Sequence, residues 1–163
     1  MAGMANWSDV EAAAPELAAA VKSRFEAYGL AILATLRRDG SPRVSGVEPL
    51  FALGELWLGM MPDSRKGIDL SRDPRCALHN ATTDKNVAEG DARISGKAVT
   101  VTDPESLDAY RAAWVASAQI PGPEPFTLFR IDVTELAMIG VADKELVVDF
   151  WREGGPPTRT TRK

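Results

Sequence analysis

Hydrophobic residues near the start of the chain recur every three or four positions, which is the spacing of one face of a helix. The residues that follow this spacing are Leu17, Val21, Phe25 and Tyr28. Ser8 or Asp9 can cap such a helix at its start, Pro15 suits a restart, and Gly29 suits its end. We therefore predict a helical N-terminal segment with a break at Pro15.

From residue 30 onward the pattern changes to short hydrophobic runs separated by turn residues, which is typical of strands. The predicted strands are 30–37, 42–53, 55–61, 75–80, 91–102, 127–133 continuing through 137–141, and 145–151. Two further helices are predicted over 64–73 and 103–118. The first three strands are joined by short turns, so we expect them to form an antiparallel meander. Six or seven strands and three helices predict an α+β fold, mainly β, in which an antiparallel barrel has helices packed outside it.

A chain of 163 residues, 45% of them hydrophobic and 26% charged, is long enough for one folded domain with a core of its own. We expect that single domain to span residues 1–152. The last residues, 153–163, are rich in glycine and proline and then basic. This composition predicts a flexible tail.

The charged and reactive residues restrict the chemistry further. A net charge of -4 argues against a nucleic-acid or anionic-membrane partner. Cys76 and His79 are the only cysteine and histidine of the sequence, so a Cys/His zinc site is excluded, and we expect no metal site. One cysteine, no signal-peptide pattern and no apolar run of about 20 residues lead us to expect a cytoplasmic protein.

The segment with the clearest chemistry lies between the strand LWLGMM and the helix predicted over 64–73. It places the hydroxyl of Ser64 and the cations Arg65 and Lys66 at a helix N-terminus. Free backbone N–H groups and the helix dipole attract anions there, and an arginine fork suits phosphate. Ser64 can equally be a plain helix cap beside two solvated cations, although cations in a first turn oppose the dipole.

The order LATLRRDGSPRV, LWLGMM, SRK and RDPRCAL resembles the flavin-binding split-barrel superfamily, whose best-known member is pyridoxamine 5′-phosphate oxidase. The resemblance covers roughly residues 17–139. Members use FMN, the deazaflavin coenzyme F420 or occasionally haem, and they are homodimers with cofactors in the subunit interface. The resemblance therefore implies a split β-barrel, a homodimer, and an FMN or F420 phosphate held by Ser64, Arg65 and Lys66.

The sequence departs from the oxidase at several places. Ser45 stands where the oxidase has a phosphate-binding arginine, and Gly59 and Met60 stand where it has a Tyr-Thr pair. Nothing after Phe126 resembles the segment of the oxidase that binds its substrate's phosphate. We therefore do not expect pyridoxamine-phosphate oxidation, and the implied function is a flavin- or deazaflavin-dependent oxidoreductase acting on another small molecule, with catalytic residues unassigned. The alternative is a non-catalytic flavin or haem carrier on the same fold.

Several further residues are candidates for the cofactor site. Arg43 and Ser45 share one face of their strand, where Arg43 either pairs with the phosphate or is a surface residue after a turn. Gly59 would let a flat ring approach the backbone, and Met60 would add to that wall or fill the core. His79 either serves as a haem or cofactor contact or has a packing role. A polar strand face, formed by Arg93, Ser95 and Lys97, either contacts the cofactor or is solvated.

Overall fold

The computed structural model describes residues 5–118, 120–122 and 124–163. Four helices occur in this part of the chain: α1 (Trp7–Ala13), α2 (Pro15–Glu26), α3 (Arg65–Arg72) and α4 (Pro104–Ala118). The strands are β1 (Ala31–Leu36), β2 (Pro42–Val47), β3 (Pro49–Ala52), β4 (Glu55–Met60), β5 (Arg75–Asn80), β6 (Asp91–Val101), β7 (Thr127–Ala142), β8 (Glu145–Arg152) and β9 (Thr158–Arg162).

All of these strands belong to one antiparallel sheet. Its main path runs in the order β2-β1-β5-β6-β7-β4-β3, and β8 and β9 extend it from the far half of β7. The chain passes from β2 to β3 through the single residue Glu48, although these strands are the two ends of the path. The sheet must therefore curl far enough to bring β2 and β3 within reach of a one-residue connection, although the two strands do not pair with each other. The result is an open split barrel, which confirms the predicted antiparallel α+β class.

Two details of the predicted strand arrangement were wrong. The strand predicted over 42–53 is divided before Pro49, which has no N–H for a continuous ladder. The two halves pair with different partners, β2 with β1 and β3 with β4. Instead of the expected three-stranded meander, the structure has two separate hairpins, β1–β2 and β3–β4, at the two ends of the strand order.

The flexible tail predicted over residues 153–163 is also corrected. Residues of β9 pair with β8. Arg159 also donates two hydrogen bonds to the carboxylate of Asp149, from Nε to Oδ1 at 2.6 Å and from Nη2 to Oδ2 at 2.9 Å. All five residues of β9 are exposed and polar or charged. An edge strand of this kind has no hydrophobic alternation, so the pattern could not reveal it. The described part of the sheet therefore has nine strands instead of six or seven.

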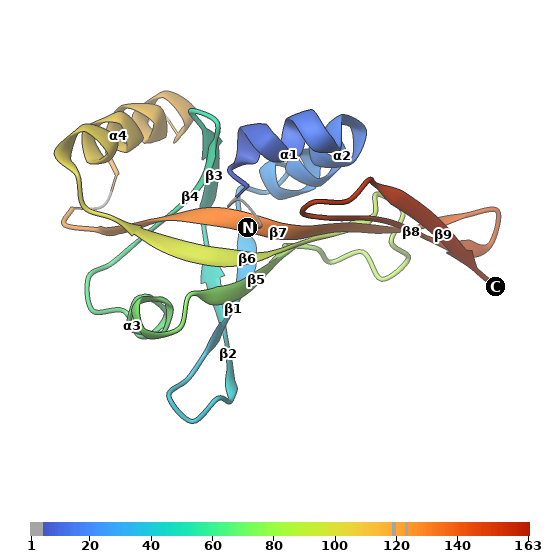
Figure 1. Ribbon diagram of the computed structural model, residues 1–163, viewed down its shortest axis with the longest axis horizontal. Helices are drawn as coiled ribbons and strands as arrows, with labels where there is room; N and C mark the ends of the chain where they lie inside the picture. Colours follow the sequence, from blue (N-terminus) through green and yellow to red (C-terminus); the bar gives the residue numbers. More distant parts are fainter. Residues whose placement is uncertain (1–4, 119, 123) are drawn as a thin grey trace.

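The hydrophobic core lies between the sheet and helices α1 and α2, which cover one side of it (Figure 1). Trp7 of α1 is 2% exposed, and its ring meets Phe51 edge-on with centroids 4.6 Å apart. The break at Pro15 is confirmed, because α2 begins there, and Gly29 adopts a φ of 64° after the helix. The cap of α1 is Asn6, whose side chain accepts from Asp9 N, instead of Ser8 or Asp9.

A second, smaller cluster joins α4 to the strands β3, β4 and β7. Its buried members are Leu50, Trp57, Tyr110 and Leu128. Helices α1 and α2 and helix α4 therefore flank different parts of the sheet, whereas α3 lies on the opposite side beside the β1–β2 hairpin (Figure 1).

Candidate functional site

The candidate site begins where β4 ends and α3 starts. Ser64 is the N-cap of α3, and its Oγ accepts a hydrogen bond from Gly67 N at 3.3 Å. This cap satisfies one of the free N–H groups of the first turn and leaves those of Arg65 and Lys66 without partners inside the helix. The side chain of Arg65 is exposed. The helix start therefore presents N–H donors and a free guanidinium to the solvent.

Two side-chain contacts fix α3 against β2. The ammonium of Lys66 donates to the carbonyl oxygen of Gly46 at 2.6 Å. One helical turn later, Asp69 Oδ2 accepts from Arg43 Nε, also at 2.6 Å. The later helix residue, Asp69, contacts the earlier strand residue, Arg43. The helix α3 therefore runs antiparallel to β2.

This arrangement brings four of the predicted residues to one place. Arg43 and Ser45 are both half-buried and lie on the same face of β2, which confirms the predicted alternation. Lys66 reaches this strand from the first turn of α3, and Ser64 stands two residues before it as the N-cap of the helix. The donors gathered here, a guanidinium, an ammonium, hydroxyls and helix N–H groups, are the set that a phosphate group requires.

Asp69 is the residue of this region that sequence reasoning missed. It is 3% exposed, and its Oδ2 accepts from Thr35 Oγ1 at 2.9 Å as well as from Arg43. Arg72 Nη1 lies 3.5 Å from Oδ1. Burial alone would raise the pKa of Asp69, but the hydrogen bonds from Arg43 and Thr35 hold it below its ordinary value, so the carboxylate is charged. The sequence did contain one sign of this residue, because Asp69 stands between the hydrophobic residues Ile68 and Leu70 on a short predicted helix.

Gly59 and Met60 both lie in packed surroundings. A Cβ atom at Gly59 would lie 2.3 Å from Tyr110 Oη, so the close approach at this glycine is made by α4. Met60 is 4% exposed and belongs to the main core, under Gly67 of α3. The alternative of Met60 as core filler agrees with this burial. Met61 beside it is 70% exposed.

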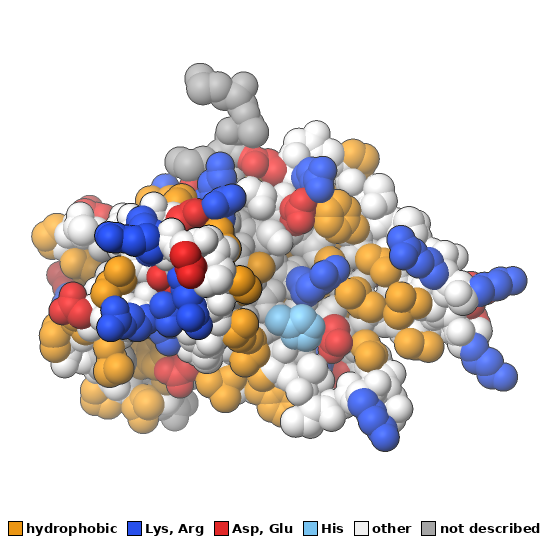
Figure 2. All heavy atoms as spheres, turned by 90° about the horizontal axis from the view of Figure 1, so that it is seen from below, with side chains coloured by type: hydrophobic (Ala, Val, Ile, Leu, Met, Phe, Trp, Pro, Cys, Tyr) orange, Lys and Arg blue, Asp and Glu red, His pale blue; other side chains and the backbone are white. Residues whose placement is uncertain are grey.

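Another group of candidates lies on the face of the sheet that faces away from α1 and α2. His79, Arg93 and Ser95 help to line a hollow of about 230 Å³ on this outer face, together with Ile32 and Val44. Figure 2 shows hydrophobic side chains on either side of the histidine on this face of the molecule, with Lys and Arg side chains toward both ends of it. This outer face is therefore partly apolar and carries polar groups at its centre.

His79 has a defined tautomer in this hollow. Its Nδ1 lies 2.7 Å from the carbonyl oxygen of Asn80, which can only accept, so Nδ1 carries the hydrogen in this contact. Nε2 then has a free lone pair when the ring is neutral, and Asp91 Oδ2 lies 3.9 Å from it. The ring can accept a proton or a hydrogen bond, or bind a metal, through Nε2.

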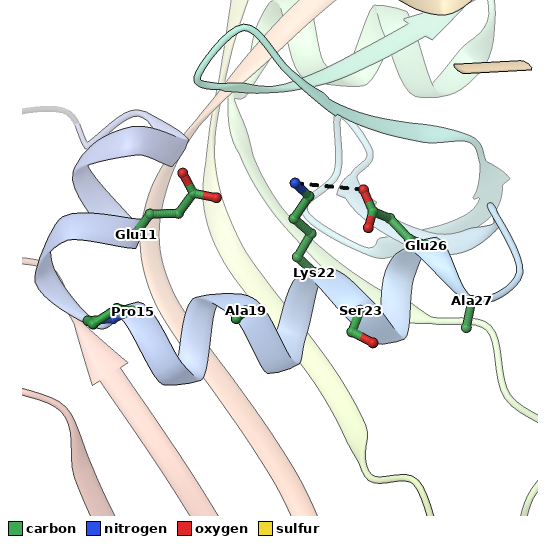
Figure 3. Close-up of a pocket in the computed structure, with 7 residues that line it drawn as sticks. All are labelled: Glu11, Pro15, Ala19, Lys22, Ser23, Glu26 and Ala27. Carbon is green, nitrogen blue, oxygen red and sulfur yellow. Dashed lines mark ion pairs between the residues drawn. The ribbon is translucent and has the colours of Figure 1, made fainter. Parts of the chain in front are cut away.

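The remaining hollows and clusters of the described chain add no chemistry to this site. A hollow of about 670 Å³ runs along α1 and α2, and its charged groups include Lys22 and Glu26, which pair at 3.9 Å (Figure 3). It contains none of the predicted site residues. Within residues 5–118, 120–122 and 124–163, no group of three metal-ligating side chains is found, and no helix is long and apolar enough to cross a membrane.

Comparison with known structures gives the fold a context. An FMN-binding, pyridoxamine 5′-phosphate oxidase-related protein of Nostoc punctiforme is 14% identical, with a TM-score of 0.64 over 92% of this chain and 96% of that one. PhzG of Burkholderia lata, in complex with tetrahydrophenazine-1-carboxylic acid, is 18% identical, with a TM-score of 0.60 over 94% and 91%. A heme binding protein of Mycobacterium smegmatis is 24% identical, with a TM-score of 0.55 over 88% and 57%.

At these identities the structural similarity establishes the fold alone. No curated protein matches the sequence significantly. The family model described as pyridoxamine 5′-phosphate oxidase matches residues 17–140, which include β2, α3 and all the predicted site residues. The chain therefore belongs to the pyridoxamine 5′-phosphate oxidase family.

Proposed function

We propose that this protein binds FMN or the deazaflavin F420 by its phosphate and serves as an oxidoreductase for a small molecule. The observation that carries the proposal is the meeting of β2 with the first turn of α3. Arg43, Ser64, Arg65 and Lys66 would hold the phosphate there, with the free N–H groups of the helix start. Ser45, between the two contacts that join the elements, would add a hydroxyl donor.

A bound flavin supplies the hydride chemistry, and the protein supplies binding, orientation and electrostatics. This division explains why the described residues around α3 contain cations and hydroxyls instead of an acid–base constellation. The family includes proteins with different substrates, and this chain lacks the substrate-phosphate segment of the oxidase. The reaction we propose is therefore hydride transfer to or from a small molecule other than pyridoxamine phosphate.

The test is a titration of the purified protein with FMN and with F420, followed by absorbance. We expect saturable binding of one of them, and a tenfold preference would correspond to about 1.4 kcal/mol. The bound cofactor should then be reduced and reoxidised by electron donors and acceptors faster than the free cofactor. A protein that binds neither cofactor would contradict the proposal, and one that binds without any gain in electron transfer would support the carrier alternative.

We also propose that two copies of the chain form a homodimer through the outer face of the sheet. Ile32 and Val44 are 43% and 66% exposed on this face, in two adjacent strands. A monomer that left them uncovered would expose a hydrophobic patch, which is a common mark of an interface. In such a dimer the hollow with His79 and Arg93 would lie near the subunit boundary.

The haem-carrier alternative rests on one observation, the free Nε2 of His79 beside apolar side chains on the outer face. A neutral imidazole in an apolar hollow is a suitable axial ligand for haem iron. Titration with hemin should then produce a Soret band that disappears in His79→Ala. A band that persists unchanged in this variant would rule out His79 as the ligand.

A further inference from the structure

The buried carboxylate of Asp69 lies next to the cations of the proposed anion site. It lies on α3, one turn after Lys66, and contacts β1 through Thr35 and β2 through Arg43. Its side chain is 5% exposed, so a negative charge is held directly behind the cations of the proposed phosphate site. Coulomb's law alone would make such a charge unfavourable for an anionic ligand.

The geometry of the Arg43 contact shows how this cost is compensated. Asp69 Oδ2 takes only the Nε hydrogen of Arg43, at 2.6 Å. Among the described residues, no hydrogen bond is found from Nη1 or Nη2 of Arg43, and the side chain is 24% exposed. An arginine held through Nε keeps the outer edge of its guanidinium available, and this edge has the planar fork that matches phosphate oxygens.

Two further contacts keep Asp69 itself in place. Thr35 Oγ1 donates to Oδ2 at 2.9 Å, and Thr35 is 2% exposed. Arg72 lies beside Oδ1 at 3.5 Å and also donates to the carbonyl oxygen of Leu36 at the end of β1. The carboxylate is therefore fixed from both of its oxygens, and Arg43 is fixed through it.

We infer that Asp69 is a positioning residue for the phosphate site: it holds Arg43 by Nε so that the terminal nitrogens of Arg43 are preorganised for the ligand's phosphate. This inference rests on the proposed function. Asp69 touches no ligand in this role, and its effect on affinity passes through Arg43. Preorganisation removes the entropy cost of ordering a long side chain at the moment of binding.

The direction in which Asp69→Ala changes the affinity for FMN distinguishes this positioning role from a purely electrostatic effect. Removal of a negative charge beside an anion site should strengthen phosphate binding if the charge acts only through the field. We expect the opposite: in Asp69→Ala, Arg43 loses its support and FMN binds about tenfold more weakly, the size of one charge-assisted hydrogen bond. Riboflavin, which has the same ring without the phosphate, should bind as it does to the unchanged protein.

The experiment is a fluorescence titration with FMN and riboflavin of four proteins: the unchanged chain, Asp69→Ala, Arg43→Ala and the double variant. Because Asp69 acts through Arg43, Asp69→Ala should cost no further FMN affinity once Arg43→Ala is present. Unchanged or tighter FMN binding by Asp69→Ala would overturn the inference, and so would an additive loss in the double variant or an equal loss for riboflavin. An unchanged chain that did not prefer FMN to riboflavin and did not bind F420 would overturn the proposed phosphate site as well.

Should Asp69→Ala fail to fold, Arg43→Lys tests the same inference while keeping the Asp69 side chain and its contacts with Thr35 and Arg72. Lysine keeps the positive charge, but its ammonium is not a planar fork of donors. It therefore cannot bind Asp69 with one edge and present a second edge to the phosphate. We expect Arg43→Lys to bind FMN as weakly as Arg43→Ala. Affinity equal to that of the unchanged chain would show that charge alone is sufficient and would overturn the positioning role.

Discussion

Gly59 lies directly against Tyr110, and a Cβ atom added at Gly59 would be 2.3 Å from Tyr110 Oη and 2.9 Å from Cζ. Tyr110 is 5% exposed and packs between Trp57 and Phe126, with ring centroids 6.1 and 5.3 Å away. The ring therefore has little room to move. This contact joins α4 to β4, and it gives the glycine a reason in packing.

The first prediction concerns this contact. Gly59→Ala should lower the free energy of unfolding by about 1–3 kcal/mol, because the added methyl overpacks a buried ring. Chemical denaturation measures the effect. Gly140→Ala is the matched control, since Gly140 also lies in a strand and a Cβ atom added there would meet nothing within 4 Å. Equal stability of Gly59→Ala and the control would show that Tyr110 yields freely.

A second prediction concerns two buried acids beside Arg130. Burial raises the pKa of Glu55 above its ordinary value, and burial likewise raises the pKa of Asp132, in each case against the attraction of Arg130. A raised pKa means that the folded state binds the proton more tightly than the unfolded state. These groups therefore contribute increasing stability as the pH falls from neutrality through their folded pKa values.

Asp132→Asn should reduce this rise in stability on acidification and make the protein more stable than the unchanged chain at pH 7. Urea unfolding between pH 7 and pH 4 measures both effects. Asp69 supplies the opposite case, because its lowered pKa gives stability that is present above 3.8 and lost as the pH falls through the folded value. An identical pH dependence in Asp132→Asn and the unchanged chain would contradict the assignment to Asp132.

The third prediction tests the proposed dimer. Val44→Asp places a charge on the exposed apolar part of the outer face and should convert a dimer to a monomer in light scattering or analytical ultracentrifugation. Val115→Asp on α4 is the control, because Val115 is 49% exposed but lies on another part of the molecule. A Val44→Asp protein with the mass of the unchanged dimer would exclude this face as the interface.

The fourth prediction concerns the C-terminal strand. Deletion of residues 153–163 should lower the melting temperature, because it removes the β9 ladder and the Arg159–Asp149 pair and uncovers the edge of β8. Arg159→Ala should have a smaller effect, since an exposed ion pair contributes at most about 1 kcal/mol. A truncated protein with an unchanged melting temperature would mean that β9 adds nothing to the fold.

The elements that could be predicted from the sequence are those whose pattern depends only on residues within the same helix or strand. The hydrophobic spacing of Leu17, Val21 and Phe25 predicted α2, and the alternation along the strand placed Arg43 and Ser45 on one face of β2. Such patterns are local. The division at Pro49 and the exposed strand β9 depend on which strands become partners, and this is decided by the whole sheet.

The candidate site shows the same limit. Ser64, Arg65 and Lys66 are adjacent in the sequence, so their place at a helix start was predictable, and Ser64 is the N-cap. The link from Asp69 to Thr35 crosses 34 residues and has no spacing rule that would reveal it. A close approach at Gly59 is predictable from a glycine within a strand, but that the approaching group is Tyr110 depends on where α4 packs.

The phosphate site at the start of α3 is tested most directly by the affinities for FMN and riboflavin of the unchanged chain and of the double variant Arg65→Ala/Lys66→Ala. We expect the unchanged chain to bind FMN at least about tenfold more tightly than riboflavin, a difference of about 1.4 kcal/mol. We expect the double variant to keep its fold by circular dichroism, to retain its riboflavin affinity and to lose the preference for FMN. An FMN affinity that is the same in the double variant and the unchanged chain would contradict the phosphate site at the start of α3.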